Sequence, residues 1–221
     1  MSDDGKMVNK IVKEPLRSAI RRELIENLFQ GNLEPGQQLN ERDLAVQLGI
    51  SRTPLREALI GLEYEGLVEA RPSRGFRVAT LDADTARQLC AIVATLEGAA
   101  VRALEEVDEA RLDELDELTR RRTETDDAGE TIRLDAEWHR KLIEGCELDE
   151  LLQLAEMIRT RLYFYEYAYL QKMDDLEESS DQHRAVTAAL REGDLEEAAE
   201  LLKEHWQTGM KTVGVWLDET G

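Results

Sequence analysis

Residues 39–78 read LNERDLAVQLGISRTPLREALIGLEYEGLVEARPSRGFRV, and this stretch decides the fold of the N-terminal part of the chain. Ala45 is small where two helices would cross, Gly49 suits a turn that needs a positive φ, and Leu55 anchors the following helix in a core. The spacing of these three residues predicts a helix-turn-helix whose second helix begins at Arg52.

After Gly66 the apolar residues recur at every second position, which predicts strands in place of helices. Residues 67–70 and 76–79 alternate as two short strands, and the basic turn 71–75 joins them. Two strands behind a helix-turn-helix form a wing. We therefore expect a winged helix-turn-helix DNA-binding domain over residues 1–80.

The exposed face at the start of the second helix carries the residues expected to read DNA. Arg52, Thr53 and Arg56 share this face, which enters the major groove in proteins of this kind. Arginine can donate two hydrogen bonds to guanine, and threonine can reach a base or a phosphate. The alternative is that these arginines only pair with neighbouring carboxylates such as Glu57 and Glu63.

Two further positions suit contact with DNA. Arg42 lies where it can meet the phosphate backbone, and Arg74-Gly75 at the wing tip fits the minor groove. The net charge of −20 looks wrong for a DNA-binding protein, yet residues 1–80 hold twelve basic and twelve acidic residues. All the net negative charge therefore lies in residues 81–221, which DNA would repel.

The chain after residue 80 shows helical periodicity throughout, and no strand pattern interrupts it. We expect a mainly α fold in which the winged helix-turn-helix is followed by an antiparallel all-α helical bundle over residues 81–221. The first expected helix begins near Asp82, the second carries Leu112, Leu115 and Leu118, and the third runs to Gly145. The fourth spans 149–172 and the fifth 176–191. The last follows a cap at Asp194.

Other features of the sequence favour a cytoplasmic protein. No apolar run is long enough to cross a membrane, and the N-terminus lacks the apolar core of a signal peptide. Cys90 and Cys146 are the only cysteines, so we expect no disulfide framework.

The three histidines of the chain are all expected to point into the bundle. Asp135 and His139 lie four residues apart on one inward face, while His183 and His205 follow apolar stripes of two other helices. A lone buried carboxylate is costly, so Asp135 needs a partner, and a divalent metal would satisfy all four groups. One aspartate and three histidines suit Zn²⁺, Ni²⁺, Fe²⁺ or Mn²⁺. For any one histidine alone, a hydrogen-bonded core position is the alternative.

Two groups of residues resemble a known family. SRTPLREAL at 51–59, with its surroundings over 12–79, is similar to the DNA-binding domain of GntR-type regulators. Asp135, His139, His183 and His205, together with LEGAA at 96–100 and AALREGD at 188–194, resemble the FadR-like subfamily, whose all-helical FCD-type sensor domain binds metal.

The resemblance implies a bacterial, homodimeric transcription regulator that is no enzyme. It implies DNA contacts by the six residues named above, and a small effector, an organic acid, bound near the metal. Val93 stands where this subfamily often has an arginine that holds the effector's carboxylate, so a less polar effector is an alternative. The aromatic residues Tyr163, Phe164, Tyr165, Tyr167 and Tyr169 either line the effector pocket or pack in the core or a dimer interface.

Two other functions use the same four metal-ligating side chains. With open coordination positions, a metal held by one aspartate and three histidines can activate water, as in a hydrolase. With none, the metal would be a structural element of the bundle. The hydrolase hypothesis leaves SRTPLREAL unexplained, so we expect a DNA-binding regulator, either a repressor or an activator.

Overall fold

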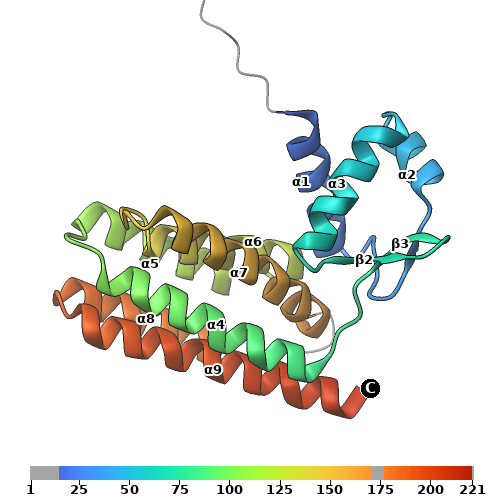
Figure 1. The fold of residues 1–221 in the computed structure, drawn as a ribbon. Coiled ribbons are helices and arrows are strands. Elements are labelled where there is room, and N and C mark those ends of the chain that lie inside the picture. Colours follow the sequence, from blue (N-terminus) through green and yellow to red (C-terminus); the bar gives the residue numbers. More distant parts are fainter. Residues whose placement is uncertain (1–14, 171–176, 221) are drawn as a thin grey trace, which may run out of the picture.

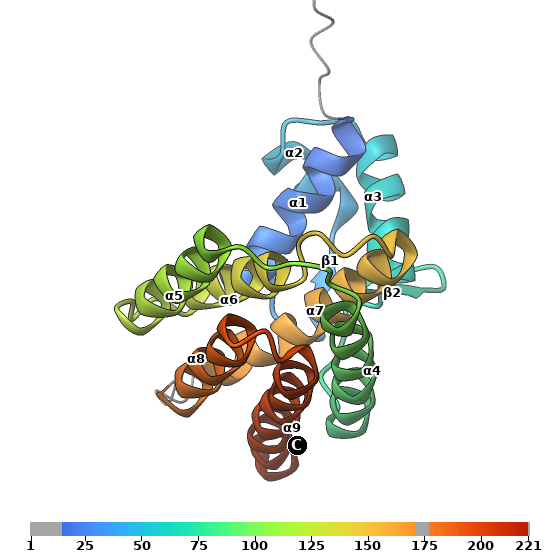
Figure 2. The same cartoon turned by 90° about the vertical axis from the view of Figure 1, so that its left-hand side faces the viewer.

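The computed structural model describes residues 15–170 and 177–220. Within these ranges a small body of helices and a sheet stands above a larger body of helices (Figures 1 and 2). The predicted fold class, a winged helix-turn-helix followed by an all-α bundle, is confirmed. No helix in the described part of the chain is long and apolar enough to span a membrane.

The N-terminal body has the expected elements and one strand that was not expected. Its sheet is antiparallel, with the order β1-β3-β2. In β1, Leu39 pairs with Phe76 of β3; a strand of two residues has no alternation to detect, so the sequence did not reveal it. The elements are α1 (Leu16–Phe29), β1 (Gln38–Leu39), α2 (Glu41–Gln47), α3 (Arg52–Tyr64), β2 (Val68–Arg71) and β3 (Gly75–Val78).

Local chemistry explains why the helix-turn-helix forms where it does. Asn40 caps α2, since its side-chain oxygen accepts hydrogen bonds from the backbone N–H groups of Arg42 at 3.0 Å and Asp43 at 3.4 Å. Gly49 has a φ of +66°, the left-handed conformation that the turn between α2 and α3 requires. Leu55 is fully buried, as the spacing predicted.

The larger body consists of helices whose apolar stripes face a common core. Helix α4 packs along α9 and α7, and α8 packs against α9 and α5. The expected helix ends at Lys172 and Leu176 lie outside the described residues. The helices are α4 (Ala83–Arg102), α5 (Glu109–Thr123), α6 (Ala128–Leu142), α7 (Asp149–Leu170), α8 (Glu177–Arg191) and α9 (Leu195–Thr220).

Helix α7 also contacts the N-terminal body. Its Tyr163 meets the Phe29 ring of α1 edge-on, with ring centroids 6.4 Å apart. The side chain of Tyr167 lies against Gly31, where an added Cβ would come within 2.9 Å of the tyrosine hydroxyl. Arg161 lies in the same way over Gly66, just before the wing, where an added Cβ would be 2.7 Å from its Nε. Helix α7 of the bundle therefore packs against the DNA-binding fold at two places, just after α1 and just before β2.

Candidate functional site

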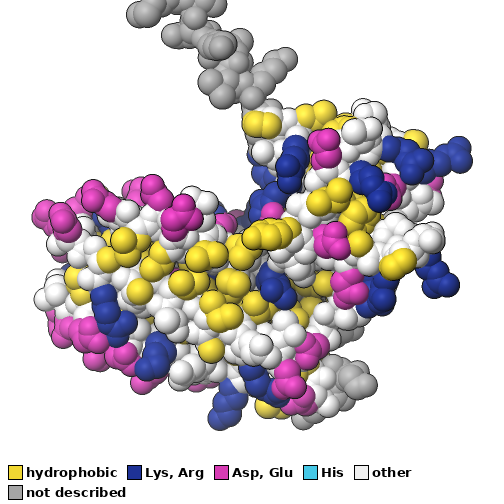
Figure 3. Space-filling model, viewed as in Figure 1, with side chains coloured by type: hydrophobic (Ala, Val, Ile, Leu, Met, Phe, Trp, Pro, Cys, Tyr) yellow, Lys and Arg dark blue, Asp and Glu magenta, His cyan; other side chains and the backbone are white. Residues whose placement is uncertain are grey.

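The basic side chains of the winged helix-turn-helix form an exposed face. Arg42, Arg52, Thr53 and Arg74 are exposed, and Gly75 takes a positive φ of 79° at the wing. The three arginines of this set form no ion pair with any residue that the structure describes. Figure 3 shows Lys and Arg side chains gathered on this body, while acidic side chains gather at the far end of the bundle.

Arg56 shares this face but is held in place by a second residue. Its Nη1 lies 2.7 Å from Oε1 of Glu41, and its guanidinium carbon lies 5.5 Å from the centre of the Phe76 ring. The predicted alternative partners, Glu57 and Glu63, are not the ones used. The Arg56 side chain remains 56% exposed while Glu41 is buried, so the ion pair orders the arginine without removing it from the surface.

Three helices bring the three histidines together in the bundle core. His139 comes from α6, His183 from α8 and His205 from α9, and all three are buried, as predicted. One ring nitrogen from each lies within 4.8 Å of those of the other two. Trp138 stacks flat on His183, with ring centroids 3.8 Å apart, which fixes the plane of that imidazole.

Asp135 lies beside this cluster, one turn before His139 on α6. It is 3% exposed, and its carboxylate oxygens lie 3.6 Å from Nε2 of His139 and 3.5 Å from Nε2 of His183. Two ligands that sit 2.0–2.1 Å from a tetrahedral ion are about 3.3 Å apart. The carboxylate and these two imidazoles are therefore close to the separation that a shared ion requires.

Arg122, near the end of α5, is a neighbour of Asp135 that the sequence analysis missed. Its Nε lies 3.0 Å from Oδ1 of Asp135, so this carboxylate has a cationic partner in the protein beside the predicted metal. The approach does not have hydrogen-bond geometry, and both atoms lack a hydrogen-bond partner within the described ranges. The missed signal is that Arg122 continues the buried stripe that contains Leu115 and Leu118.

Glu97, in the LEGAA segment of α4, orients His139 from behind. Its carboxylate accepts hydrogen bonds from Nδ1 of His139 at 2.9 Å and Nε1 of Trp206 at 2.8 Å, and from Nη1 of Arg159 at 2.8 Å. Burial alone would raise the pKa of Glu97, but its interactions with His139 and Arg159 outweigh this effect and hold the pKa at about 2. Since Nδ1 of His139 is used, its Nε2 is left for the cluster.

The remaining imidazoles also present free nitrogens. Nδ1 of His205 lies 3.1 Å from the side-chain oxygen of Gln182, which leaves its Nε2. Both ring nitrogens of His183 and Nε2 of His139 are buried without a hydrogen-bond partner among the described residues. Burial, and then the neighbouring charges, lower the pKa of His183 and of His205 well below the usual value, so both imidazoles are neutral. Neutral imidazoles with orphaned nitrogens fit a divalent metal.

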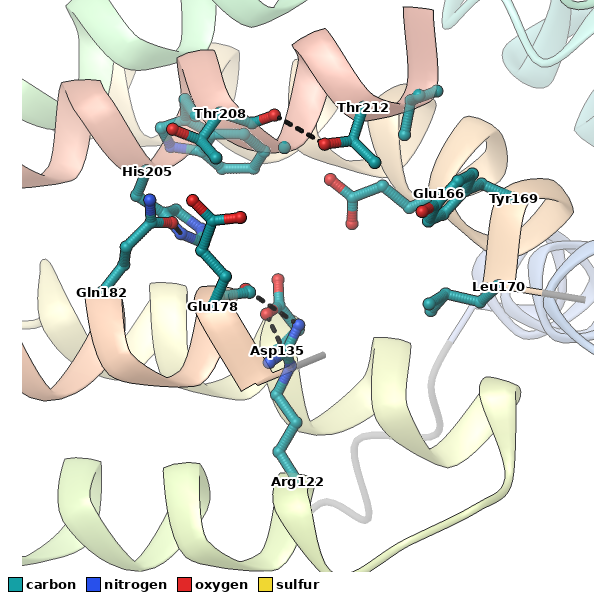
Figure 4. Close-up of a pocket in the computed structure, with 14 residues that line it drawn as sticks. Arg122, Asp135, Glu166, Tyr169, Leu170, Glu178, Gln182, His205, Thr208 and Thr212 are labelled. Carbon is teal, nitrogen blue, oxygen red and sulfur yellow. Dashed lines mark hydrogen bonds and ion pairs between the residues drawn. The ribbon is translucent and has the colours of Figure 1, made fainter. Parts of the chain in front are cut away.

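A cavity of about 110 Å³ opens beside Asp135 and His205 (Figure 4). Of the five aromatic residues of α7 that we considered for an effector pocket, only Tyr169 lines it; the others are buried by packing. Val93 is fully buried in α4 and does not line this cavity. The polar lining residues are Arg122, Asp135, Glu166, Tyr169, Glu178, Ser179, Gln182, His205, Thr208 and Thr212.

Comparisons with known proteins match both halves of this chain. The FCD domain family matches residues 88–208, and the family described as bacterial regulatory proteins, gntR family, matches residues 16–78. The chain is 33% identical over 179 residues to the Nta operon transcriptional regulator of Aminobacter aminovorans, over 80% of this chain and 84% of that protein. It is 29% identical over 201 residues to the HTH-type transcriptional repressor GlaR of Escherichia coli strain K12, over 84% and 90% of the two chains. The solved structure of E. coli McbR/YncC has the same fold, with a TM-score of 0.77 at 23% identity over 91% of this chain and 98% of that one.

The buried Glu97 gives a first prediction. Replacement Glu97→Gln removes the buried one of the two carboxylates that pair with Arg159, the other being Glu156, and breaking one partner of a buried ion pair costs about 3 kcal/mol. We expect the free energy of unfolding in urea to fall by about that amount. The control is Glu196→Gln, which breaks an exposed pair with Arg102 between α4 and α9 and should leave stability unchanged. Equal stability of the two variants would show that Glu97 contributes nothing to the core.

Proposed function

The chain belongs to the GntR family of bacterial regulatory proteins and carries an FCD domain, and from this premise we propose that it binds operator DNA as a cytoplasmic homodimer under the control of a small effector. Residues 1–80 bind the DNA. Residues 81–221 hold the metal and the effector and form the dimer. The named relatives are transcriptional regulators, so the chain is a regulator, not the hydrolase considered above.

The DNA contact in this proposal rests on the exposed cations of the N-terminal body. Helix α3 enters the major groove, where Arg52, Thr53 and Arg56 face base edges. Arg42 meets the phosphate backbone, and the wing tip at 74–75 enters the minor groove. The exposed guanidinium groups of Arg42, Arg52 and Arg74, which form no ion pair within the described residues, support this assignment.

The metal centre rests on one observation, the buried imidazole nitrogens that have no hydrogen-bond partner among the described residues. His139, His183, His205 and Asp135 would hold one Zn²⁺, Ni²⁺, Fe²⁺ or Mn²⁺ ion. Such an ion supplies a Lewis acid to which an effector carboxylate can bind. The adjoining cavity, open beside Asp135 and His205, supports an effector-binding role over a purely structural metal.

Helix α7 offers the physical route from effector to DNA. Glu166 and Tyr169 line the cavity, while Tyr163 of the same helix packs on Phe29 of α1. Burial, and then the negative charge of Asp135, raise the pKa of Tyr163 well above its usual value. An effector that shifts α7 would change which spacings of the two winged domains are populated in the dimer.

An uncharged surface on α4 and α7 supports the homodimer. Between Arg87 and Arg102 the only charged residue of α4 is the buried Glu97. Ile92 of α4 is 46% exposed and Leu154 of α7 is 48% exposed, and Figure 3 shows hydrophobic side chains gathered over these helices. In a chain of net charge −20, an apolar surface of this kind is the natural place for a second copy.

DNA binding is tested with Arg52→Ala and Arg56→Ala. Loss of one base-reading arginine costs about 1–3 kcal/mol, so each variant should bind a selected operator about 5- to 150-fold more weakly in a titration at fixed salt. Wild-type affinity should also fall steeply as salt rises. Arg184→Ala, on α8 of the bundle, is the control and should bind as wild type does. Wild-type affinity of both recognition-helix variants would refute the assignment.

Metal binding is tested by elemental analysis of the purified full chain. We expect one divalent ion per chain, and less than a tenth of that in His183→Ala. A chelator should lower the melting temperature of the wild type, because an ion at a hundred times its dissociation constant adds about 2.7 kcal/mol to stability. Val186→Ala weakens the same helix core without removing a ligand and should keep its metal. A wild type that holds no metal, and gains no stability from added divalent ions, would contradict the proposal.

The dimer surface is tested with Ile92→Glu. A charge at this position should prevent the apolar faces from meeting, so sedimentation should give the mass of the 25.2 kDa chain, where the wild type gives twice that mass. Val46→Glu, at a 75% exposed position on α2, is the control and should remain dimeric. A dimeric Ile92→Glu variant would place the interface elsewhere.

A further inference from the structure

A buried carboxylate lies where α3 and the wing meet. Glu41, the first residue of α2, is 8% exposed, and its Oε1 lies 2.7 Å from Nη1 of Arg56 on α3. A Cβ added to Gly75 of β3 would lie 3.4 Å from the same oxygen. Glu41 therefore contacts both of the elements that the proposed function places in the grooves of DNA.

Stability alone does not account for this carboxylate. Its second oxygen, Oε2, is buried and has no hydrogen-bond partner among the described residues. A buried acceptor without a partner costs free energy, and an ion pair to a largely exposed arginine returns little of it. The carboxylate of Glu41 therefore matters through the arginine that it holds.

Glu41 fixes the direction of the Arg56 side chain. A hollow of about 480 Å³ lies beside Arg56, and Glu41 lines it together with the wing residues 70–73, 75 and 76. Packing alone therefore leaves the arginine room to turn. Among the described residues, Glu41 is the only one that forms a hydrogen bond with Arg56. The Phe76 ring adds a contact at 5.5 Å, which constrains the guanidinium less than a hydrogen bond does.

An arginine in a major groove has two kinds of partner. It can donate two hydrogen bonds to the edge of a guanine, which requires one orientation of the guanidinium. It can also pair with a phosphate of either strand, which many orientations allow and which carries no sequence information. A carboxylate bonded to the arginine restricts its orientation and repels phosphate, so it favours the contact with the base.

We propose that Glu41 is a positioning residue for DNA recognition, which holds Arg56 toward a base edge and thereby sets the selectivity of the protein at one base pair. This inference rests on the proposed function, because it concerns the same DNA contact. Glu41 acts through Arg56 and needs no contact with DNA of its own. Replacement by glutamine should lower selectivity, while affinity for DNA of random sequence stays equal or rises, since a negative charge near the phosphates is removed.

The test is a titration of the full chain, at fixed salt, with a selected operator and each of its single-base-pair variants. Arg56→Ala identifies the base pair that Arg56 reads, where the wild type should discriminate about 5- to 150-fold. Glu41→Gln should reduce the discrimination at that base pair at least about fivefold and leave the other positions unchanged. In an Arg56→Ala background the same replacement should cause no further loss, because both effects act through one contact.

Two further variants separate the position of the carboxylate from its charge. Glu41→Asp keeps the charge and suits the first turn of a helix, but its carboxylate reaches about 1.5 Å less far, too short for a hydrogen bond to Nη1 of an unmoved Arg56. It should lose the same discrimination, and it replaces the glutamine variant if that one does not fold. Glu57→Gln is the matched control. Glu57 is exposed beside Arg56 and forms no hydrogen bond or ion pair with a described residue, so this variant should discriminate as the wild type does.

A folded Glu41→Gln or Glu41→Asp variant with unchanged discrimination would overturn the inference. So would an equal loss at all base pairs together with weaker binding of random-sequence DNA, which would show that Glu41 only supports the fold. Either result, in a chain whose wild type binds the operator selectively, contradicts the inference alone. A wild type that selects no sequence contradicts the proposed function as well.

Discussion

The burial of polar ring nitrogens constrains the whole C-terminal body. His139 and His183 are completely buried, and their orphaned nitrogens would each cost free energy in a dry core. The surrounding helices supply partners for these polar groups. Glu97 of α4 orients His139, Arg122 of α5 pairs with Asp135, and Trp138 of α6 stacks on His183. One ring nitrogen of each histidine lies within 4.8 Å of those of the other two, an arrangement that suits the divalent ion proposed above.

The same arrangement explains how a site in the bundle can influence the winged helix-turn-helix. Helix α7 has the cavity on one face, at Glu166 and Tyr169, and the DNA-binding fold on another, at Tyr163 and Tyr167. A buried helix moves against both neighbours together, because packed interfaces have discrete arrangements and do not deform continuously. A ligand that contacts Glu166 therefore touches the same helix that packs on α1.

The sequence predicted those features that depend on local spacing. Ala45, Gly49 and Leu55 gave the helix-turn-helix, and apolar stripes placed all three histidines inward. It did not reveal features that depend on contacts between distant segments. Arg122 lies thirteen positions before Asp135 on another helix, and the partner of Arg56 is Glu41, not a residue of its own helix. The hydrophobic periodicity of a sequence does not reveal pairs formed between separate elements. The two-residue β1 is likewise defined only by its pairing with β3.

The most direct test of the metal centre is X-ray diffraction from crystals of the full chain, with data collected on both sides of the absorption edge of the metal found in the protein. Our account predicts one anomalous peak per chain, bonded to nitrogens of His139, His183 and His205 and to an oxygen of Asp135. Histidine nitrogens joined only by ordered water or by one another, with no anomalous peak even after crystals are soaked in divalent ions, would contradict it.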